Sequence, residues 1–304
     1  QNDHGIITSL LQQTHEFRRI MEEEDDFPCE NFFDMRASLL HISAVGTYLD
    51  EAELYSLKTS LATTGEIVEF LNRGEDDVPT YPALQELTSD IQCFPAIIQR
   101  IENILNKFGK IKDNASPELQ EIRENLSLTK RNITISLHKI LHRAQESGYV
   151  DKDVTPTFRD GRLVIPIASA LKRKIRGIVH DESATGKTVF IEPAEVVESN
   201  NRVRELELEE KRAIIVILQS VTDFIRPQTQ DLLESHRFLG QIDAIRAKAI
   251  LADATDAIEP NVENKTTIDW VRAYHPLLQT FMKRSGRSME PLDIELTPEG
   301  RILL

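Results

Sequence analysis

The sequence is poor in cysteine, glycine, proline and aromatic residues. Its 304 residues include two cysteines, Cys29 and Cys93, too few for a disulfide framework or a cysteine-rich zinc site. Twelve glycines, 13 prolines and 6% aromatic residues favour helices over a β-sandwich or barrel. No apolar run approaches the ~20 residues that a membrane-spanning helix requires, and no signal peptide opens the chain. These absences predict a soluble, cytoplasmic, mainly α-helical protein with no membrane contact.

Charge is unevenly distributed along the chain. Acidic residues outnumber basic ones by 50 to 36, so the net charge is −14. This average argues against a nucleic-acid partner but does not exclude one, because phosphate binding requires only a local basic patch. Residues 159–176 supply such a patch, with six basic residues against one acid, Asp160. The predicted phosphate contacts are Arg159, Arg162, Lys172, Arg173, Lys174, Arg176 and Lys187.

Apolar residues recur at helical spacing along most of the chain. The spacing predicts helices over the ranges 5–23, 54–71, 83–108, 117–147 and 194–253, with a break in the last range at Arg226-Pro227. Pro95 falls inside the third range, which therefore forms either one kinked helix or two helices in succession. The helix that follows Ser116-Pro117 runs for about 30 residues, or roughly 45 Å, which is long enough to form an arm.

Short β-rich runs interrupt the helical pattern over residues 154–192. Turn residues at Asp160-Gly161 and at 183–186 separate these runs, so we expect a small β-structure between two long helices. Strand-like runs return at 267–271 and 292–296. The final Ile302-Leu303-Leu304 predicts the start of a buried strand, which would need partners that the sequence does not contain. We therefore expect the sequence to be a piece of a longer protein.

Residues 183–188 (Ser-Ala-Thr-Gly-Lys-Thr) resemble the end of a nucleotide-binding P-loop. A P-loop requires a glycine where Asp181 stands, and a helix where the β-run after Thr188 stands. The pattern favours a tight hairpin turn in which Gly186 supplies a positive φ. A nucleotide-binding enzyme that uses this segment remains the alternative, and ATP-dependent thermal stabilisation would reveal it.

Other candidate sites are weak. His138 and His142 share a helix face, but no acid completes a metalloprotease motif, so surface or packing histidines are favoured over a metal site. Neither Cys29 nor Cys93 has a histidine or lysine near it in sequence to depress a thiol pKa, and we expect both to be buried and unreactive. The sequence therefore predicts no catalytic, cofactor-binding or metal-binding residues.

Several segments resemble a signature of the MutS-two branch of the MutS mismatch-repair superfamily. They are 159–166 (RDGRLVIP), 177–193 (GIVHDESATGKTVFIEP), 200–212 (NNRVRELELEEKR), 275–278 (HPLL) and 291–296 (PLDIEL). The resemblance implies a mainly α fold: a helical core, long antiparallel lever helices that carry a small β-rich clamp tip, and a β-containing C-terminal stub of an ABC-type ATPase domain. The implied parts are core and outgoing lever 1–150, clamp 151–200, returning lever and core helices 201–258, and ATPase stub 259–304.

The resemblance also implies a function. Members of this family are associated with clamping branched or irregular duplex DNA, with DNA repair and with suppression of homologous recombination. The alternative is a ribosome- or RNA-binding helical module that acts on stalled ribosomes. The resemblance implies that the parent protein uses ATP and magnesium, forms a homodimer through its ATPase domain and carries a possible C-terminal nuclease domain. The family's P-loop would follow a strand that begins at Arg301, so we expect no ATPase activity from residues 1–304 themselves.

Overall fold

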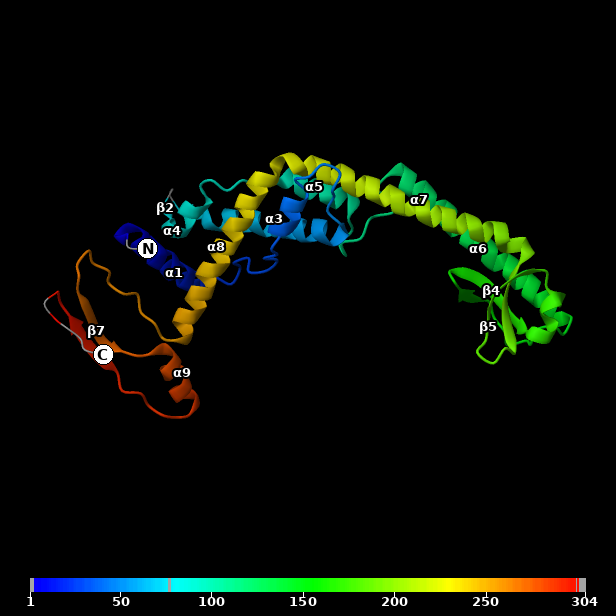
Figure 1. The fold of residues 1–304 in the computed structure, drawn as a ribbon. Coiled ribbons are helices and arrows are strands. Elements are labelled where there is room, and N and C mark those ends of the chain that lie inside the picture. The colour runs from blue at the N-terminus through cyan, green and yellow to red at the C-terminus, as the bar shows by residue number, and fades with distance from the viewer. Residues whose placement is uncertain (1–2, 76–77, 299, 301–304) are drawn as a thin grey trace. The chain divides into compact units, whose positions relative to one another are not determined.

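The computed structural model describes residues 3–75, 78–298 and 300 (Figure 1). Helices make up more than half of the chain, so the predicted mainly α class is confirmed. The chain divides into two compact units. We call residues 1–43, 56–98 and 227–304 the helical unit, and residues 44–55 and 99–226 the sheet unit. The strand predicted from Arg301 to Leu304 lies outside the described residues.

Several helices of the helical unit pack around a shared apolar core. Its elements are α1 (His4–Glu23), α2 (Arg36–His41), most of α3 (Glu51–Leu71), β1 (Gly74–Glu75), β2 (Val78–Pro79), α4 (Pro82–Gln85), η1 (Glu86–Thr88), the first turn of α5 (Pro95–Ile104) and α8 (Thr229–Ala254). Phe17 and Ile20 of α1 pack with Phe70 of α3 and Ile242 of α8. The predicted helix over 83–108 is two separate pieces, α4–η1 and α5, because Pro95 starts a new helix.

The last elements of the helical unit are β7 (Ile268–Ala273), α9 (Pro276–Arg284) and β8 (Leu292–Leu296). β7 and β8 pair antiparallel, which confirms the two strands predicted there. Within the described residues, none of the helices combines the length and the apolar character needed to cross a membrane.

Cys29 and Cys93 are both exposed, so the expectation of buried thiols was wrong. The absence of basic residues near the two cysteines in sequence does not predict whether their side chains are buried, because burial depends on tertiary packing.

Two long antiparallel helices, α6 (Pro117–Glu146) and α7 (Ala194–Ile225), form the body of the sheet unit. Ser116 caps α6 by accepting a hydrogen bond from the Leu119 amide, which confirms the predicted start. Two ion pairs join the helices at 2.8 Å, Arg123–Glu210 and Lys130–Glu207, so residue numbers rise along one helix as they fall along the other. α7 ends at the predicted break, where η3 (Arg226–Gln228) follows.

A four-stranded antiparallel sheet packs against α6 and α7 at one end of the pair (Figure 1). Its elements are β3 (Thr157–Arg159), β4 (Arg162–Ala168), η2 (Ser169–Lys174), β5 (Gly177–Glu182) and β6 (Thr188–Pro193), and the strand order is β3-β4-β6-β5. Ile165 and Ile191 of the sheet share a buried cluster with Leu137 of α6 and Val196 of α7. The sheet is therefore fixed to the helix pair by an apolar core of its own.

Both predicted turns of the sheet are present. Asp160 and Gly161 join β3 to β4 with φ values of 50° and 73°. Two positive φ values in a two-residue loop are the geometry of a type I′ turn, for which Asp-Gly is a preferred pair. Gly186 has a φ of 67° in the turn between β5 and β6. The turn residues in the sequence therefore predicted both hairpin turns correctly.

A candidate nucleic-acid interface

The sheet unit brings five of the seven predicted phosphate contacts onto one connected surface. They are Lys172, Arg173 and Lys174 in η2, Arg176 just before β5, and Lys187 in the turn before β6. The Ser169 amide donates to the Lys187 carbonyl at 2.9 Å, which places the start of η2 beside the β5–β6 turn. The Ala194 amide donates to the Arg176 carbonyl at 2.9 Å, which ties the segment after η2 to the start of α7. We call these five residues the basic surface.

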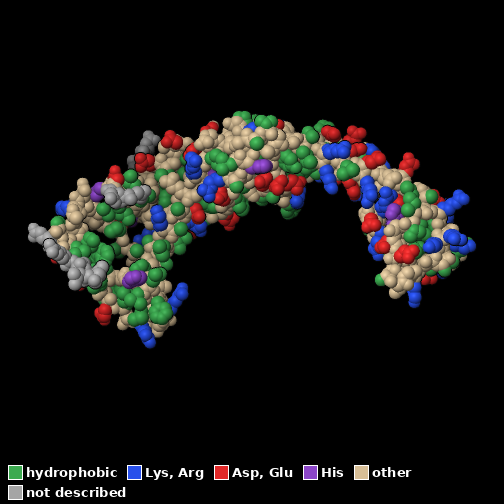
Figure 2. Space-filling model, in the orientation of Figure 1, with side chains coloured by type: hydrophobic (Ala, Val, Ile, Leu, Met, Phe, Trp, Pro, Cys, Tyr) green, Lys and Arg blue, Asp and Glu red, His purple; other side chains and the backbone are tan. Residues whose placement is uncertain are grey.

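The side chains of the basic surface are exposed and free of acidic partners. Among the residues that the structure describes, no carboxylate lies within ion-pair distance of any of the five. The Lys174 ammonium lies 5.3 Å from the centre of the Tyr149 ring, a cation–π contact that leaves its charge accessible. Lys and Arg side chains project into solvent around the sheet in Figure 2. These cations can therefore contact an anionic partner without first breaking an internal ion pair.

The other two predicted contacts, Arg159 and Arg162, interact with groups of the sheet unit itself. The Arg162 guanidinium donates to both carboxylate oxygens of Glu192, at 2.7 and 2.9 Å, and its side chain is only 14% exposed. The Arg159 guanidinium lies 4.0 Å from the centre of the Phe190 ring and 3.4 Å from the Asp181 carboxylate. Arg162 therefore stabilises the sheet, and Arg159 is partly committed to it.

The sequence analysis did not predict the partner of Arg162, which is the buried carboxylate of Glu192 on β6. Glu192 has no exposed side-chain area and also accepts from His180 Nε2 at 2.6 Å and Asn200 Nδ2 at 2.7 Å. Burial alone would raise the pKa of Glu192, but the hydrogen bonds from His180, Asn200 and Arg162 outweigh it and hold this pKa below its ordinary value. The carboxylate thus joins β4, β5, β6 and α7 as an anion.

The sequence marked the members of this network only through the family resemblance. Arg162, His180, Glu192 and Asn200 all lie in the segments that carry the family resemblance. Their spacing along the chain, however, does not reveal that four elements converge on one carboxylate. Of the basic surface, only Lys187 lies in these segments, so the resemblance could not divide structural cations from accessible ones.

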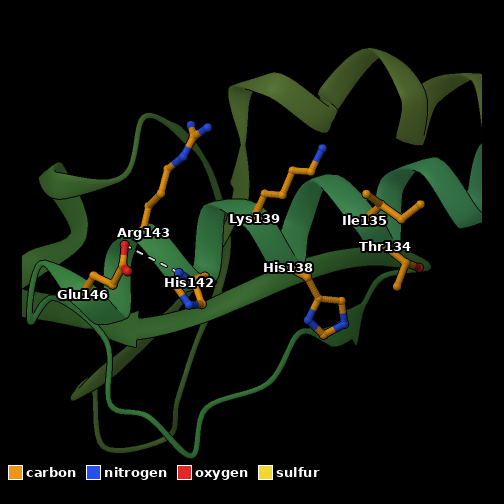
Figure 3. Close-up of a pocket in the computed structure, with 7 residues that line it drawn as sticks. All are labelled: Thr134, Ile135, His138, Lys139, His142, Arg143 and Glu146. Atoms are coloured by element: carbon orange, nitrogen blue, oxygen red, sulfur yellow. Dashed lines mark ion pairs between the residues drawn. The ribbon is translucent and has the colours of Figure 1, made fainter.

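A second group of basic residues lines an open hollow of about 620 Å³ along α6 (Figure 3). Lys139 and Arg143 project from one side of the helix, and His138 and His142 project from another. His142 is paired with Glu146 at 3.5 Å. In the described part of the chain, no cluster of three or more His, Cys, Asp or Glu side chains could hold a metal ion. The hollow therefore offers basic side chains and a helix surface rather than a catalytic group.

The segment 183–188 forms a hairpin turn rather than a phosphate-binding loop. Ser183 Oγ accepts from the Thr188 amide at 3.0 Å, and the Gly186 amide donates to the Ser183 carbonyl at 2.7 Å. β6 begins at Thr188, where a P-loop would begin a helix. The amides of Gly186 and Thr188, which a P-loop would direct at a nucleotide, are therefore already hydrogen-bonded within the turn.

Three relatives illustrate what the chain is similar to. It is 31% identical over 290 residues to the protein named Endonuclease MutS2 from Geobacillus sp. (strain WCH70), a match that covers 95% of this chain and 36% of the relative. The protein of the same name from Latilactobacillus sakei is 32% identical over 277 residues, 91% of this chain and 35% of the relative. That from Thermomicrobium roseum is 31% identical over 308 residues, 99% of this chain and 38% of the relative. The chain spans about a third of the length of these curated relatives. No family model matches the chain.

Proposed function

Because this chain belongs to the MutS2 branch of the MutS superfamily, we propose that it binds the phosphate backbone of branched or irregular duplex DNA. This binding serves DNA repair and the suppression of homologous recombination. The observation that carries the proposal is the basic surface, five exposed cations without acidic partners in the described part of a chain whose net charge is −14.

The charge distribution explains why DNA contacts this surface. Lys and Arg side chains that neutralise phosphates release condensed counterions, and this release drives binding at low salt. The acidic remainder of the chain repels the same phosphates, so contact elsewhere is disfavoured. The six residues of η2 carry three cations and no acid, which gives a locally high density of positive charge. Lys139 and Arg143 on α6 extend the positive potential along the helix pair.

Within this proposal, the chain is divided into the structural parts that the family resemblance implies. Residues 1–150 hold the helical core and an outgoing lever, 151–200 the clamp, 201–258 the returning lever and core helices, and 259–304 the start of an ATPase domain. The antiparallel pair of α6 and α7 supports the lever assignment, and the sheet with η2 supports the clamp. The whole protein would use ATP with magnesium, pair as a homodimer and couple nucleotide state to the clamp through the levers.

Salt-titrated binding to duplex and four-way-junction DNA tests the proposal. The test variant is the triple charge reversal Lys172→Glu, Arg173→Glu and Lys174→Glu. We expect weaker binding and a flatter dependence of log affinity on log salt, by about 0.9 for each phosphate that the variant no longer neutralises. Fluorescence anisotropy at several salt concentrations measures both quantities.

A matched control keeps the same change in total charge. Lys211, Arg212 and Lys248 are exposed on α7 and α8, outside the basic surface, and their triple reversal to Glu should leave the salt slope near that of the original protein. A test variant with an unchanged slope, or a control with an equal loss, would contradict the assignment of DNA contact to η2.

A second candidate function is binding to stalled ribosomes. The basic surface favours it equally, because ammonium and guanidinium groups contact RNA phosphates as they contact DNA phosphates. Competition between junction DNA and ribosomes for the same protein distinguishes the two. Displacement of junction DNA from the original protein at a low ribosome concentration, together with weaker ribosome binding by the η2 triple variant, would favour the ribosome as the main target.

A further inference from the structure

A tight turn between α5 and α6 holds an aromatic ring out in solvent. Leu105 and Ile111 form an isolated antiparallel bridge, and both side chains are buried. The Asn106 amide donates to the Lys110 carbonyl at 2.9 Å across the same turn. At its tip Phe108 is 76% exposed, more than any other Phe, Tyr or Trp among the described residues. We call residues 104–112 the Phe108 turn.

The exposure of Phe108 is a fixed feature of the backbone. Asn106 Oδ1 accepts from the amides of Phe108 and Lys110, at 2.9 and 3.1 Å. Gly109 has a φ of 73°, and a Cβ at this position would lie 3.1 Å from the Tyr55 ring. The positive φ favours glycine here, and any larger residue would also crowd the Tyr55 ring. These contacts hold the backbone of the turn in one conformation, which keeps the Phe108 side chain on its solvent-facing side.

The surroundings of Phe108 suit a nucleotide in three respects. The ring offers a flat apolar face, on which nucleobases of any sequence stack. The Lys107 ammonium lies 5.0 Å from the ring centre and offers a positive charge to a phosphate near a stacked base. An open hollow of about 780 Å³ adjoins the turn at Asn106 and Lys112. Its other lining groups can donate or accept hydrogen bonds, and they include two carboxylates that could accept from the amino groups of a base: Asp113, Asn114, Gln120, Arg123, Glu124 and Ser127. Its size lies in the range of small-ligand pockets.

We propose that the Phe108 turn and the adjoining hollow bind an unpaired nucleotide of DNA, with the base stacked on Phe108 and its phosphate beside Lys107. The inference rests on the proposed function and deepens it, because it gives the chain a means to distinguish irregular DNA from a regular duplex. In a regular duplex, bases are paired and stacked on each other, so none is available to the ring. The basic surface supplies affinity for any phosphate backbone, and the Phe108 turn supplies preference for unpaired bases.

The experiment compares two DNA probes of equal length, a fully paired duplex and the same duplex with a short run of unpaired thymines. The variants are Phe108→Ala and Phe108→Trp in the full chain. We expect Phe108→Ala to weaken binding of the unpaired probe by about tenfold and to leave binding of the paired duplex unchanged. Phe108→Trp should restore the preference. When Phe108→Trp is combined with Trp270→Phe, the chain holds a single indole, and the unpaired probe alone should quench its fluorescence.

The matched control is Phe281→Ala, which removes another exposed ring, 63% accessible, from α9. It should change neither affinity. Equal losses for both probes, or no loss for either, would overturn the proposal for Phe108 while leaving the basic surface as the DNA contact. Failure of the original protein to bind either probe would instead overturn the proposed function, and the Phe108 inference with it.

Discussion

The same stretch of sequence holds two kinds of cation, and the structure treats them in opposite ways. Arg162 lies in the sheet with its guanidinium on the buried Glu192 carboxylate, and its side chain is 14% exposed. Arg173, eleven residues later in η2, is exposed and has no acidic partner among the described residues. In the sequence both are arginines of one basic cluster. Burial and the nearest carboxylate, rather than residue type, decide which cation holds the fold and which faces a partner.

The physical reason is the cost of desolvation. A buried ion pair survives because each charge satisfies the other, so removing one partner leaves an uncompensated charge in a medium of low dielectric. An exposed cation is hydrated, and its removal costs the fold almost nothing. The comparison therefore predicts that stability and DNA binding separate cleanly between the two arginines. Four variants of the sheet unit, two of them at these arginines, follow in order of their expected effect on the free energy of unfolding.

Arg162→Ala should have the largest effect. It leaves Glu192 buried without its guanidinium partner, and we expect the sheet unit to lose about 3 kcal/mol or more of its free energy of unfolding. Urea unfolding followed by far-UV circular dichroism measures the loss. Trp270 lies in the helical unit, so its fluorescence serves as an internal control that should move little. A loss below about 1 kcal/mol would place Arg162 with the exposed cations.

Gly177→Ala should have the next largest effect. A Cβ on Gly177 would lie 2.1 Å from the Glu192 backbone oxygen, where β5 and β6 approach each other. Backbone cannot rotate away as a side chain can, so we expect a loss of about 2 kcal/mol or more. Gly240→Ala is the control: it lies inside α8 with no atom near the added Cβ, and should stabilise the chain by about 0.5 to 1 kcal/mol. Equal effects at the two sites would contradict the close approach at Gly177.

Local patterns in the sequence predicted most of the fold. Ser116-Pro117 marks the start of α6, and Asp160-Gly161 and Gly186 mark the two hairpin turns, because capping and positive φ depend on neighbouring residues. The interruption near Pro95 was predicted, but the sequence left one kinked helix or two equally open. The buried network around Glu192 could not be predicted, since it joins four elements that are distant along the chain.

The candidate site shows the same limit. A count of Lys and Arg selected one segment as the candidate interface, and five of the seven predicted residues are exposed and form the basic surface. The count could not separate Arg162, because its carboxylate partner lies 30 residues away on another strand. The count also missed Lys139 and Arg143, because they lie outside the basic segment. Their spacing of four residues places them on one side of α6. Charge in a sequence locates a surface, and packing decides its members.

Acid should weaken the sheet unit through Glu192. Its pKa is held below the ordinary value in the folded protein, so the carboxylate contributes stability above its unfolded pKa of about 4.3 and loses it as the pH falls through the lowered value. Glu192→Gln keeps the shape and cannot titrate. We expect the variant to be less stable at neutral pH, with a dependence on pH below about 5 that is flatter by up to about 1.4 kcal/mol per unit. Parallel curves for the two proteins would mean that Glu192 does not titrate in this range.

Arg173→Ala should have the smallest effect on stability, within about 0.5 kcal/mol, because its side chain is exposed and free of acidic partners among the described residues. Its effect on DNA should be clear: the slope of log affinity against log salt should fall by about 0.9, the value of one phosphate contact. Arg162→Ala, assayed where it remains folded, should leave that slope unchanged. This pair of results would show that Arg162 stabilises the sheet and that Arg173 contacts DNA, although both belong to one basic cluster in the sequence. If Arg173→Ala instead lowered stability and kept the slope, the two arginines would share a structural role, and the DNA contact would lie elsewhere on the sheet unit.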